Sequence, residues 1–180
     1  MKLLIASDIH GSVYYMDLLM NRIKEEKPDR IIMLGDFLYH GPRNDLPKDY
    51  NPKKVIEMLN SLDEIIAVRG NCDAEVDQMV LNFPLMADYK CIDVDGISFY
   101  LSHGHIYNQD NPIKGMKDVL LCGHTHVPGY IEKDNFVYIN PGSVSIPKND
   151  SCNSYLVYEN KKFEFKRVDD GQIFNTYVLA

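Results

Sequence analysis

Hydrophobic positions in the first half of the chain alternate between short continuous runs and helical spacing. The helical spacing predicts one helix from an N-cap at Ser12 to about Glu26 and a second that opens at Pro52. Short apolar runs before, between and after them predict strands at 2–6, 30–34 and 64–68. This βαβαβ order predicts parallel strands joined by right-handed crossovers.

The pattern in the second half is that of β-structure. Asp95-Gly96 and Asp134-Asn135 each separate two short apolar runs, which predicts two hairpins. The predicted strands of this half are 91–94, 97–101, 119–122, 129–132, 136–139, 155–158, 162–168 and 173–178. The whole pattern predicts an α/β fold with two packed sheets flanked by helices, in a single domain spanning residues 1–180.

Composition narrows the classes of partner. The net charge of −7 argues against binding along nucleic-acid polymers or anionic membranes, because both need a basic face. A small phosphate ester stays possible, since its binding depends on local charge. No apolar run reaches transmembrane length, and no export signal is recognisable. The four cysteines lack metal-finger spacing, so we expect free thiols in a cytoplasmic protein.

Five of the predicted strands end in Asp, Asn or His, in most cases beside a glycine. The motifs, in chain order, are Asp8-x-His10, Gly35-Asp36, Gly70-Asn71, His103-Gly104-His105 and Gly123-His124-Thr125-His126. Each motif alone is an ordinary turn or a polar strand end. In α/β sheets, however, ligands bind at the carboxyl ends of the strands, and five coincidences at that end indicate a single site.

Histidine nitrogens with carboxylate and amide oxygens suit Mn, Fe, Zn, Co or Ni. We expect two divalent ions, with Mn²⁺ first among them. Two cations ~3.5–4 Å apart need a shared anion, which a carboxylate can supply, so Asp36 is the expected bridge. The expected ligands are Asp8, His10 and His126 for one ion and Asn71, His103 and His124 for the other. With a bridging hydroxide, the pair would leave a net charge of about +1 to attract a phosphate.

As an ordered set, these motifs resemble those of the calcineurin-like metallophosphoesterases, from Leu3 to about Pro147. Segments 40–44, 69–73 and 140–143 are similar to the bacterial YfcE-type phosphodiesterases. The resemblance implies a four-layer α-β-β-α sandwich and the ligand set above. It also implies hydrolysis of small phosphodiesters by in-line attack of a metal-bound hydroxide.

The resemblance also suggests catalytic residues next to the ligands: Asn71, Cys72, Asp73 and His105. Most of the superfamily has histidine where this chain has Cys72, so this residue is either a proton donor or a buried filler. His105 either touches the phosphate or orients its loop. Arg43, with His40 nearby, is a candidate for clamping a phosphoryl oxygen.

Two other functions stay open: a protein-binding scaffold of the same fold, and a phosphomonoesterase. All seven ligand positions are present, which favours an enzyme. The expected partner is a small phosphodiester, and assembly into a homo-oligomer is possible.

Overall fold

The computed structural model describes residues 1–179. Its elements are β1 (Leu3–Ala6), α1 (Val13–Glu26), β2 (Arg30–Met33), α2 (Pro52–Asn60), β3 (Ile65–Ala67), α3 (Glu75–Gln78), β4 (Tyr89–Val94), β5 (Ile97–Ser102), β6 (Asp118–Leu121), β7 (Gly129–Glu132), β8 (Phe136–Asn140), β9 (Ser154–Glu159), β10 (Lys162–Arg167) and β11 (Ile173–Val178). The predicted strands and the two predicted helices are confirmed within two residues at each end. The sequence analysis missed the single-turn helix α3.

Local chemistry explains where the two long helices begin. The hydroxyl of Ser12 accepts the backbone N–H of Tyr15 at 3.4 Å, which caps α1 as predicted. At α2 the cap is Asn51, whose side chain accepts the N–H of Lys54 at 3.3 Å. Both caps satisfy N–H groups that the first helical turn leaves without partners.

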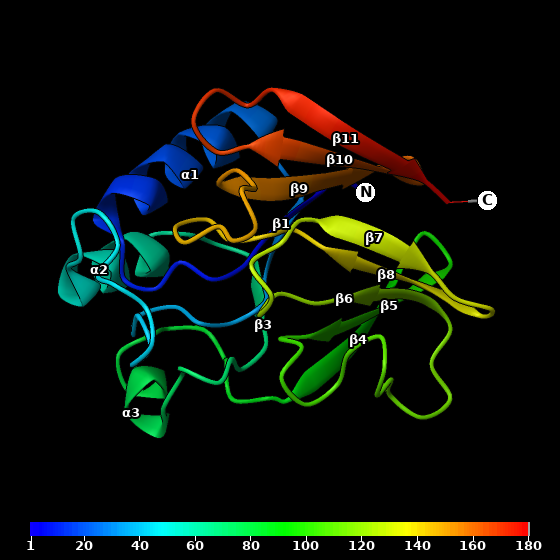
Figure 1. Cartoon of the computed structure of the whole chain (residues 1–180), viewed down its shortest axis with the longest axis horizontal. Helices are drawn as coiled ribbons and strands as arrows, with labels where there is room; N and C mark the ends of the chain where they lie inside the picture. The colour runs from blue at the N-terminus through cyan, green and yellow to red at the C-terminus, as the bar shows by residue number, and fades with distance from the viewer. Residues whose placement is uncertain (180) are drawn as a thin grey trace.

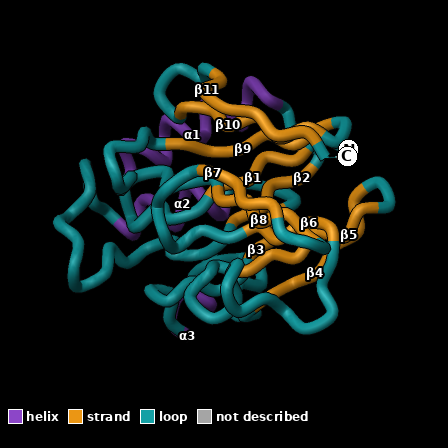
Figure 2. Tube along the Cα trace, turned by 45° about the vertical axis from the view of Figure 1, so that its right-hand side comes forward, coloured by secondary structure: helices purple, strands orange, loops and turns teal. Residues whose placement is uncertain are grey.

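The strands form two mixed sheets that stack on each other (Figures 1 and 2). The first sheet has the order β11-β10-β9-β1-β2-β3, in which β1, β2 and β3 are parallel. The second has the order β4-β5-β6-β8-β7, in which β5, β6 and β8 are parallel. Each sheet therefore brings several carboxyl strand ends to one edge.

Alternation along β1 shows how the layers are held together. Leu3 and Ile5 pack between the sheets, whereas Leu4 and Ala6 face the helices. The first sheet is covered on its outer face by α1 and α2, which bury Met16, Leu19, Ile23, Val55 and Leu59. Both faces of β1 are thus apolar, as expected for a central parallel strand.

The predicted α/β fold with two packed sheets is confirmed, and a loop contributes to the outer layer of the second sheet. A loop following β5 places Ile113 and Met116 against Leu120 and Tyr138 of the second sheet. Side chains of this loop therefore bury part of that face. Among the described residues, no helix has the length and apolar character needed to span a membrane.

Candidate metal centre

Backbone hydrogen bonds join the segments that follow β1 and β2. Asp8 N–H donates to Gly35 O at 3.1 Å, and His10 N–H donates to Asp36 O at 3.0 Å. In the second sheet, the N–H of Gly123 donates to His103 O at 2.8 Å. The motifs predicted from the strand ends therefore meet in one place.

Several of these polar residues adopt left-handed backbone conformations. The five that do so, with φ between 50° and 66°, are Asp8, His10, Asp36, His124 and His126. For residues other than glycine such conformations cost roughly 1–2 kcal/mol each. A cluster of them is typical of functional sites, where the surrounding fold enforces the strain.

Glycine is required at two positions because neighbouring elements approach closely. A Cβ added to Gly70 would collide with the carboxylate and backbone N of Asp36. A Cβ on Gly123 would collide with Ser7 Oγ and would lie 2.6 Å from Asp8 Oδ2. Each glycine thus leaves room for one of the two buried carboxylates.

Three buried histidines have their Nδ1 atoms occupied by backbone carbonyls. His10 Nδ1 donates to Tyr39 O at 2.7 Å, His103 Nδ1 to Leu34 O at 2.7 Å, and His126 Nδ1 to Ile146 O at 2.6 Å. In the neutral rings, these hydrogen bonds leave each Nε2 with a free lone pair. Carbonyl partners of this kind orient metal-binding histidines.

The first group of ligand atoms contains Asp8, His10 and His126. His10 Nε2 lies 3.3 Å from His126 Nε2, and Asp8 Oδ1 lies 3.1 Å from His126 Nε2 and 3.5 Å from His10 Nε2. Asp8 Oδ1 is buried without a hydrogen-bond partner. Three lone-pair donors crowded together require a cation, and these residues fit a divalent metal.

The second group forms around Asp36, Asn71 and His103. His103 Nε2 lies 3.0 Å from Asn71 Oδ1 and 3.4 Å from Asp36 Oδ2. The same Asp36 oxygen lies 3.7 Å from Nε2 of His10, which belongs to the first group. Asp36 therefore lies between the two groups, where a bridging carboxylate would have to be.

The electrostatics of the protein alone favour positive charge in this cavity. Burial would raise the pKa of Asp8, but the charge of His103 and the neighbouring rings of His10 and His126 hold it well below its ordinary value. Burial opposes protonation of His103, yet Asp8 and Asp36 raise the pKa of that ring to about 9. Two buried carboxylates thus demand compensating cations, which bound metals can supply.

His124 and His105 lie beside this centre. The N–H of His124 donates to Asp8 Oδ2 at 3.0 Å, and its ring centroid is 5.1 Å from that of His103. Burial and the charge of His103 lower the pKa of both His124 and His105. His105 faces an adjoining polar hollow that is also lined by Asn108 and Tyr138. Its ring centroid lies 5.4 Å from that of His103.

Cys72 lies in the hollow above the candidate ligands, whereas its neighbour Asp73 lies beneath them. Cys72 lines the hollow above the ligands, and its sulfur accepts a hydrogen bond from Asn71 Nδ2 at 3.3 Å. Burial and the charge of Asp36 raise the pKa of this thiol to about 12. Asp73 lies beneath the site, where it accepts backbone N–H groups of Asp36, Phe37 and Gly70 at 2.7–2.9 Å. The structure thus places Asp73 where it orients the Asp36 loop, and it does not line the hollow.

Of the two residues predicted to bind phosphate, Arg43 and His40, one lines the hollow and the other does not. Arg43 lines the hollow above the ligands. The ring of His40 instead makes edge contacts with Tyr39 and Tyr50, and it does not line that hollow. Lys148 also lines the hollow and makes no ion pair within residues 1–179. The sequence analysis missed it, because a lysine in a polar loop gives no recognisable signal.

Segment 140–146 supports the centre from below. Ser143 and Ser145 hydroxyls donate to Asp8 O at 2.8 and 3.1 Å, and Asn140 Nδ2 donates to Gly123 O at 2.7 Å. Ser143 Oγ also accepts the N–H of Ile146 at 2.9 Å, and the carbonyl of Ile146 holds His126. This segment is therefore one of the elements that orient the candidate ligands.

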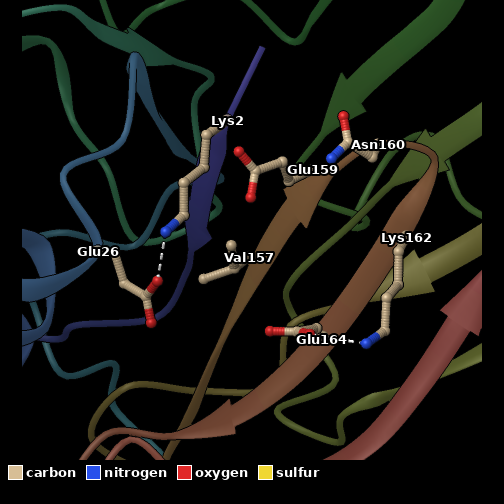
Figure 3. Close-up of a pocket in the computed structure, with 7 residues that line it drawn as sticks. All are labelled: Lys2, Glu26, Val157, Glu159, Asn160, Lys162 and Glu164. Atoms are coloured by element: carbon tan, nitrogen blue, oxygen red, sulfur yellow. Dashed lines mark hydrogen bonds and ion pairs between the residues drawn. The ribbon is translucent and has the colours of Figure 1, made fainter.

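A larger hollow of about 230 Å³ lies at the opposite end of β1 (Figure 3). Its lysines are paired with glutamates: Lys2 with Glu26 at 2.7 Å and Lys162 with Glu164 at 2.8 Å. It contains no histidine, in contrast to the metal centre. The residues of this hollow therefore offer neither a soft metal ligand nor a free cation for phosphate.

Fold and site together define a metal-dependent hydrolase of phosphate esters. Residues 1–162 match the calcineurin-like phosphoesterase superfamily domain. The chain belongs to this superfamily and is an enzyme of the metallophosphoesterase class.

Particular relatives match almost the whole chain. Phosphodiesterase YfcE of Escherichia coli (strain K12) is 42% identical over 175 residues, which cover 96% of this chain and 95% of YfcE. A solved structure of YfcE, described as a phosphoesterase, superposes with a TM-score of 0.96 at 40% identity and covers both chains completely. Phosphodiesterase MJ0936 of Methanocaldococcus jannaschii is 29% identical over 93% of this chain and 98% of its own length.

Proposed function

We propose that this protein is a dinuclear-metal phosphodiesterase that hydrolyses small phosphodiesters. The observation that carries the proposal is the convergence of three histidine Nε2 atoms on two buried carboxylates, with Asp36 placed between two groups of ligand atoms. The 42% identical relative YfcE is a phosphodiesterase, which supports a diester as substrate.

The proposed ligands of one ion are Asp8, His10 and His126, and those of the other are Asn71, His103 and His124, with Asp36 shared. When bound, the metal pair supplies positive charge for the phosphoryl oxygens and activates water as the nucleophile; we expect Mn²⁺ to serve best. Attack of water on phosphorus in line with the ester oxygen would form one P–O bond as the other breaks, and the proton released by water would leave with the alcohol.

The chain's own residues orient these groups. Carbonyl oxygens of Tyr39, Leu34 and Ile146 hold the three ligand rings. Asp73 fixes the backbone of Asp36, and Cys72 N–H donates to Asp36 Oδ1 at 2.8 Å, which leaves Oδ2 free to face both groups. His105 lies at the edge of the centre, where it contacts the substrate or orients the loop after β5.

Two other functions make different predictions. A phosphomonoesterase would prefer aryl monoesters over diesters with the same metal. A scaffold would hydrolyse neither ester. The solved structure of Vps29 from Entamoeba histolytica, with a TM-score of 0.63 at 17% identity, is similar to this chain in fold alone.

The test is hydrolysis of bis-p-nitrophenyl phosphate and p-nitrophenyl phosphate by protein loaded with Mn²⁺, Fe²⁺, Zn²⁺, Co²⁺ or Ni²⁺. We expect faster turnover of the diester, highest activity with Mn²⁺, and loss of activity on chelation. Metal-replete protein that is inactive on both esters would contradict the proposal, and a clear preference for the monoester would replace it with a phosphomonoesterase.

A further inference from the structure

Two cations on the rim of the metal hollow have no ion-pair or hydrogen-bond partner for their side chains among the described residues. Arg43 lies in the loop after β2 and Lys148 in the loop after β8, and both exposed residues are among those that line the hollow. Within residues 1–179, neither side chain makes an ion pair or a hydrogen bond. In the hollow of Figure 3, by contrast, Lys2 and Lys162 each form an ion pair with a glutamate.

The rest of the lining does not neutralise them. Among the described residues that line this hollow, Asp36 is the one acidic side chain, and the metal ligand His103 already lies 3.4 Å from its free oxygen. The whole chain nevertheless carries a net charge of −7. A local excess of positive charge in an acidic protein concentrates anionic ligands at that point.

The net charge of the loaded site, counted on the basis of the proposed function, leads to the same conclusion about Arg43 and Lys148. Two dications with Asp8 and Asp36 leave about +2, which a hydroxide nucleophile and a diester monoanion reduce to about zero. The metal centre is then balanced by a simple diester. Arg43 and Lys148 still contribute about +2 that such a substrate leaves uncompensated.

We propose that the site selects phosphodiesters whose retained arm bears a further anionic group, a phosphoryl or carboxylate, held by Arg43 and Lys148. Lys148 is thereby assigned as a substrate-positioning residue. The planar guanidinium of Arg43 can hold two anionic oxygens at once, whereas the ammonium of Lys148 acts as a point charge. The two residues come from different loops, so their joint action depends on the folded site.

A matched pair of substrates tests the proposal. Thymidine 5′-(p-nitrophenyl phosphate) and its 3′-phosphorylated derivative share nucleoside and leaving group and differ in one anionic group. We expect kcat/KM to be about tenfold higher for the 3′-phosphorylated ester at low ionic strength, with most of the difference in KM and a decline of the preference as salt increases. Arg43→Gln and Lys148→Gln should each reduce this ratio about threefold, and the double variant should bring it near one.

A binding measurement separates this inference from the proposed activity. Calorimetry on the wild-type holoenzyme should show about tenfold tighter binding of thymidine 3′,5′-bisphosphate than of thymidine 5′-monophosphate. The double variant should lose that difference, whereas Lys24→Gln, an exposed lysine on α1 with the same change of charge, should keep it. Equal binding of the two nucleotides by the wild type, or a preference that the double variant retains, would overturn the inference even if diester hydrolysis is confirmed.

Discussion

Asp36→Asn isolates the charge that we place between the two metals. Asparagine has the shape of aspartate, and its side-chain oxygen can still accept the N–H of Cys72. Asp73 continues to hold the backbone of residue 36. The substitution therefore removes one negative charge from the site and little else.

The magnitude of the effect follows from Coulomb's law. At an effective dielectric constant of ~20, two dications ~4 Å apart repel each other by roughly 16 kcal/mol. A unit negative charge in direct contact with either ion, at ~2 Å, contributes an attraction of about the same size. Without the shared carboxylate the repulsion is no longer offset, so we expect loss of at least one metal and a fall in kcat/KM of about 10³-fold or more.

Elemental analysis of purified Asp36→Asn protein, together with kcat/KM on bis-p-nitrophenyl phosphate, tests this expectation. Asp17→Asn, on the exposed face of α1, makes the same chemical change away from the site and should keep metals and activity. Thermal unfolding monitored by circular dichroism should show that both variants are folded. Retention of two metals per chain by Asp36→Asn would refute the bridging role.

Three further changes test other parts of the molecule. Cys72→Ala should alter kcat/KM on bis-p-nitrophenyl phosphate less than about threefold, because p-nitrophenolate leaves without a proton donor; a loss of about 10²-fold with metals retained would contradict a spectator thiol. Gly123→Ala should displace Asp8, lower metal content and destabilise the fold by about 1–3 kcal/mol, whereas Gly129→Ala, where an added Cβ meets no atom within 4 Å, should do neither. Glu26→Gln should destabilise the fold by about 1–3 kcal/mol in denaturant titrations at neutral pH, because it removes the charge that pairs with Lys2 and Lys166. Burial would raise the pKa of the Glu26 carboxyl, but Lys166 and Lys2 lower it below the ordinary value of 4.5. The contribution of Glu26 to the free energy of unfolding is therefore present above pH 4.5 and is lost as pH falls through the lower pKa of the folded state. Equal stability of Glu26→Gln and wild type at pH 7 would contradict this.

The strands and the meeting of the candidate metal ligands could be predicted from sequence because each rests on a local pattern. Continuous apolar runs mark strands buried on both faces, and a polar residue beside a glycine marks the end of such a strand. The parallel order of β1, β2 and β3 then places Asp8, Asp36 and Asn71 at one edge. The ligand positions therefore follow from topology without any knowledge of side-chain contacts.

The outer layer of the second sheet lacked such a pattern. Ile113 and Met116 lie in a polar, glycine-containing loop and show no helical spacing, yet they cover that sheet. Cover of this kind depends on contacts between distant segments, which periodicity does not report. The helix α3 has only four residues, too few to produce a recognisable period.

Asp73 shows why a residue's part in a site is harder to predict than its presence there. Its position after Asn71 suggested a catalytic carboxylate, but three backbone N–H groups converge on it from residues 36, 37 and 70. A carboxylate engaged in this way orients the loops that carry Asp36 and Asn71 and has no need to meet the substrate. Asp73→Asn replaces one acceptor oxygen with an NH₂ group, which cannot accept a hydrogen bond from a backbone N–H. We therefore expect the variant to hold Asp36 less firmly and to bind less metal. The pH profile and leaving-group dependence of the remaining activity should stay as in the wild type, whereas loss of a catalytic acid or base would change both.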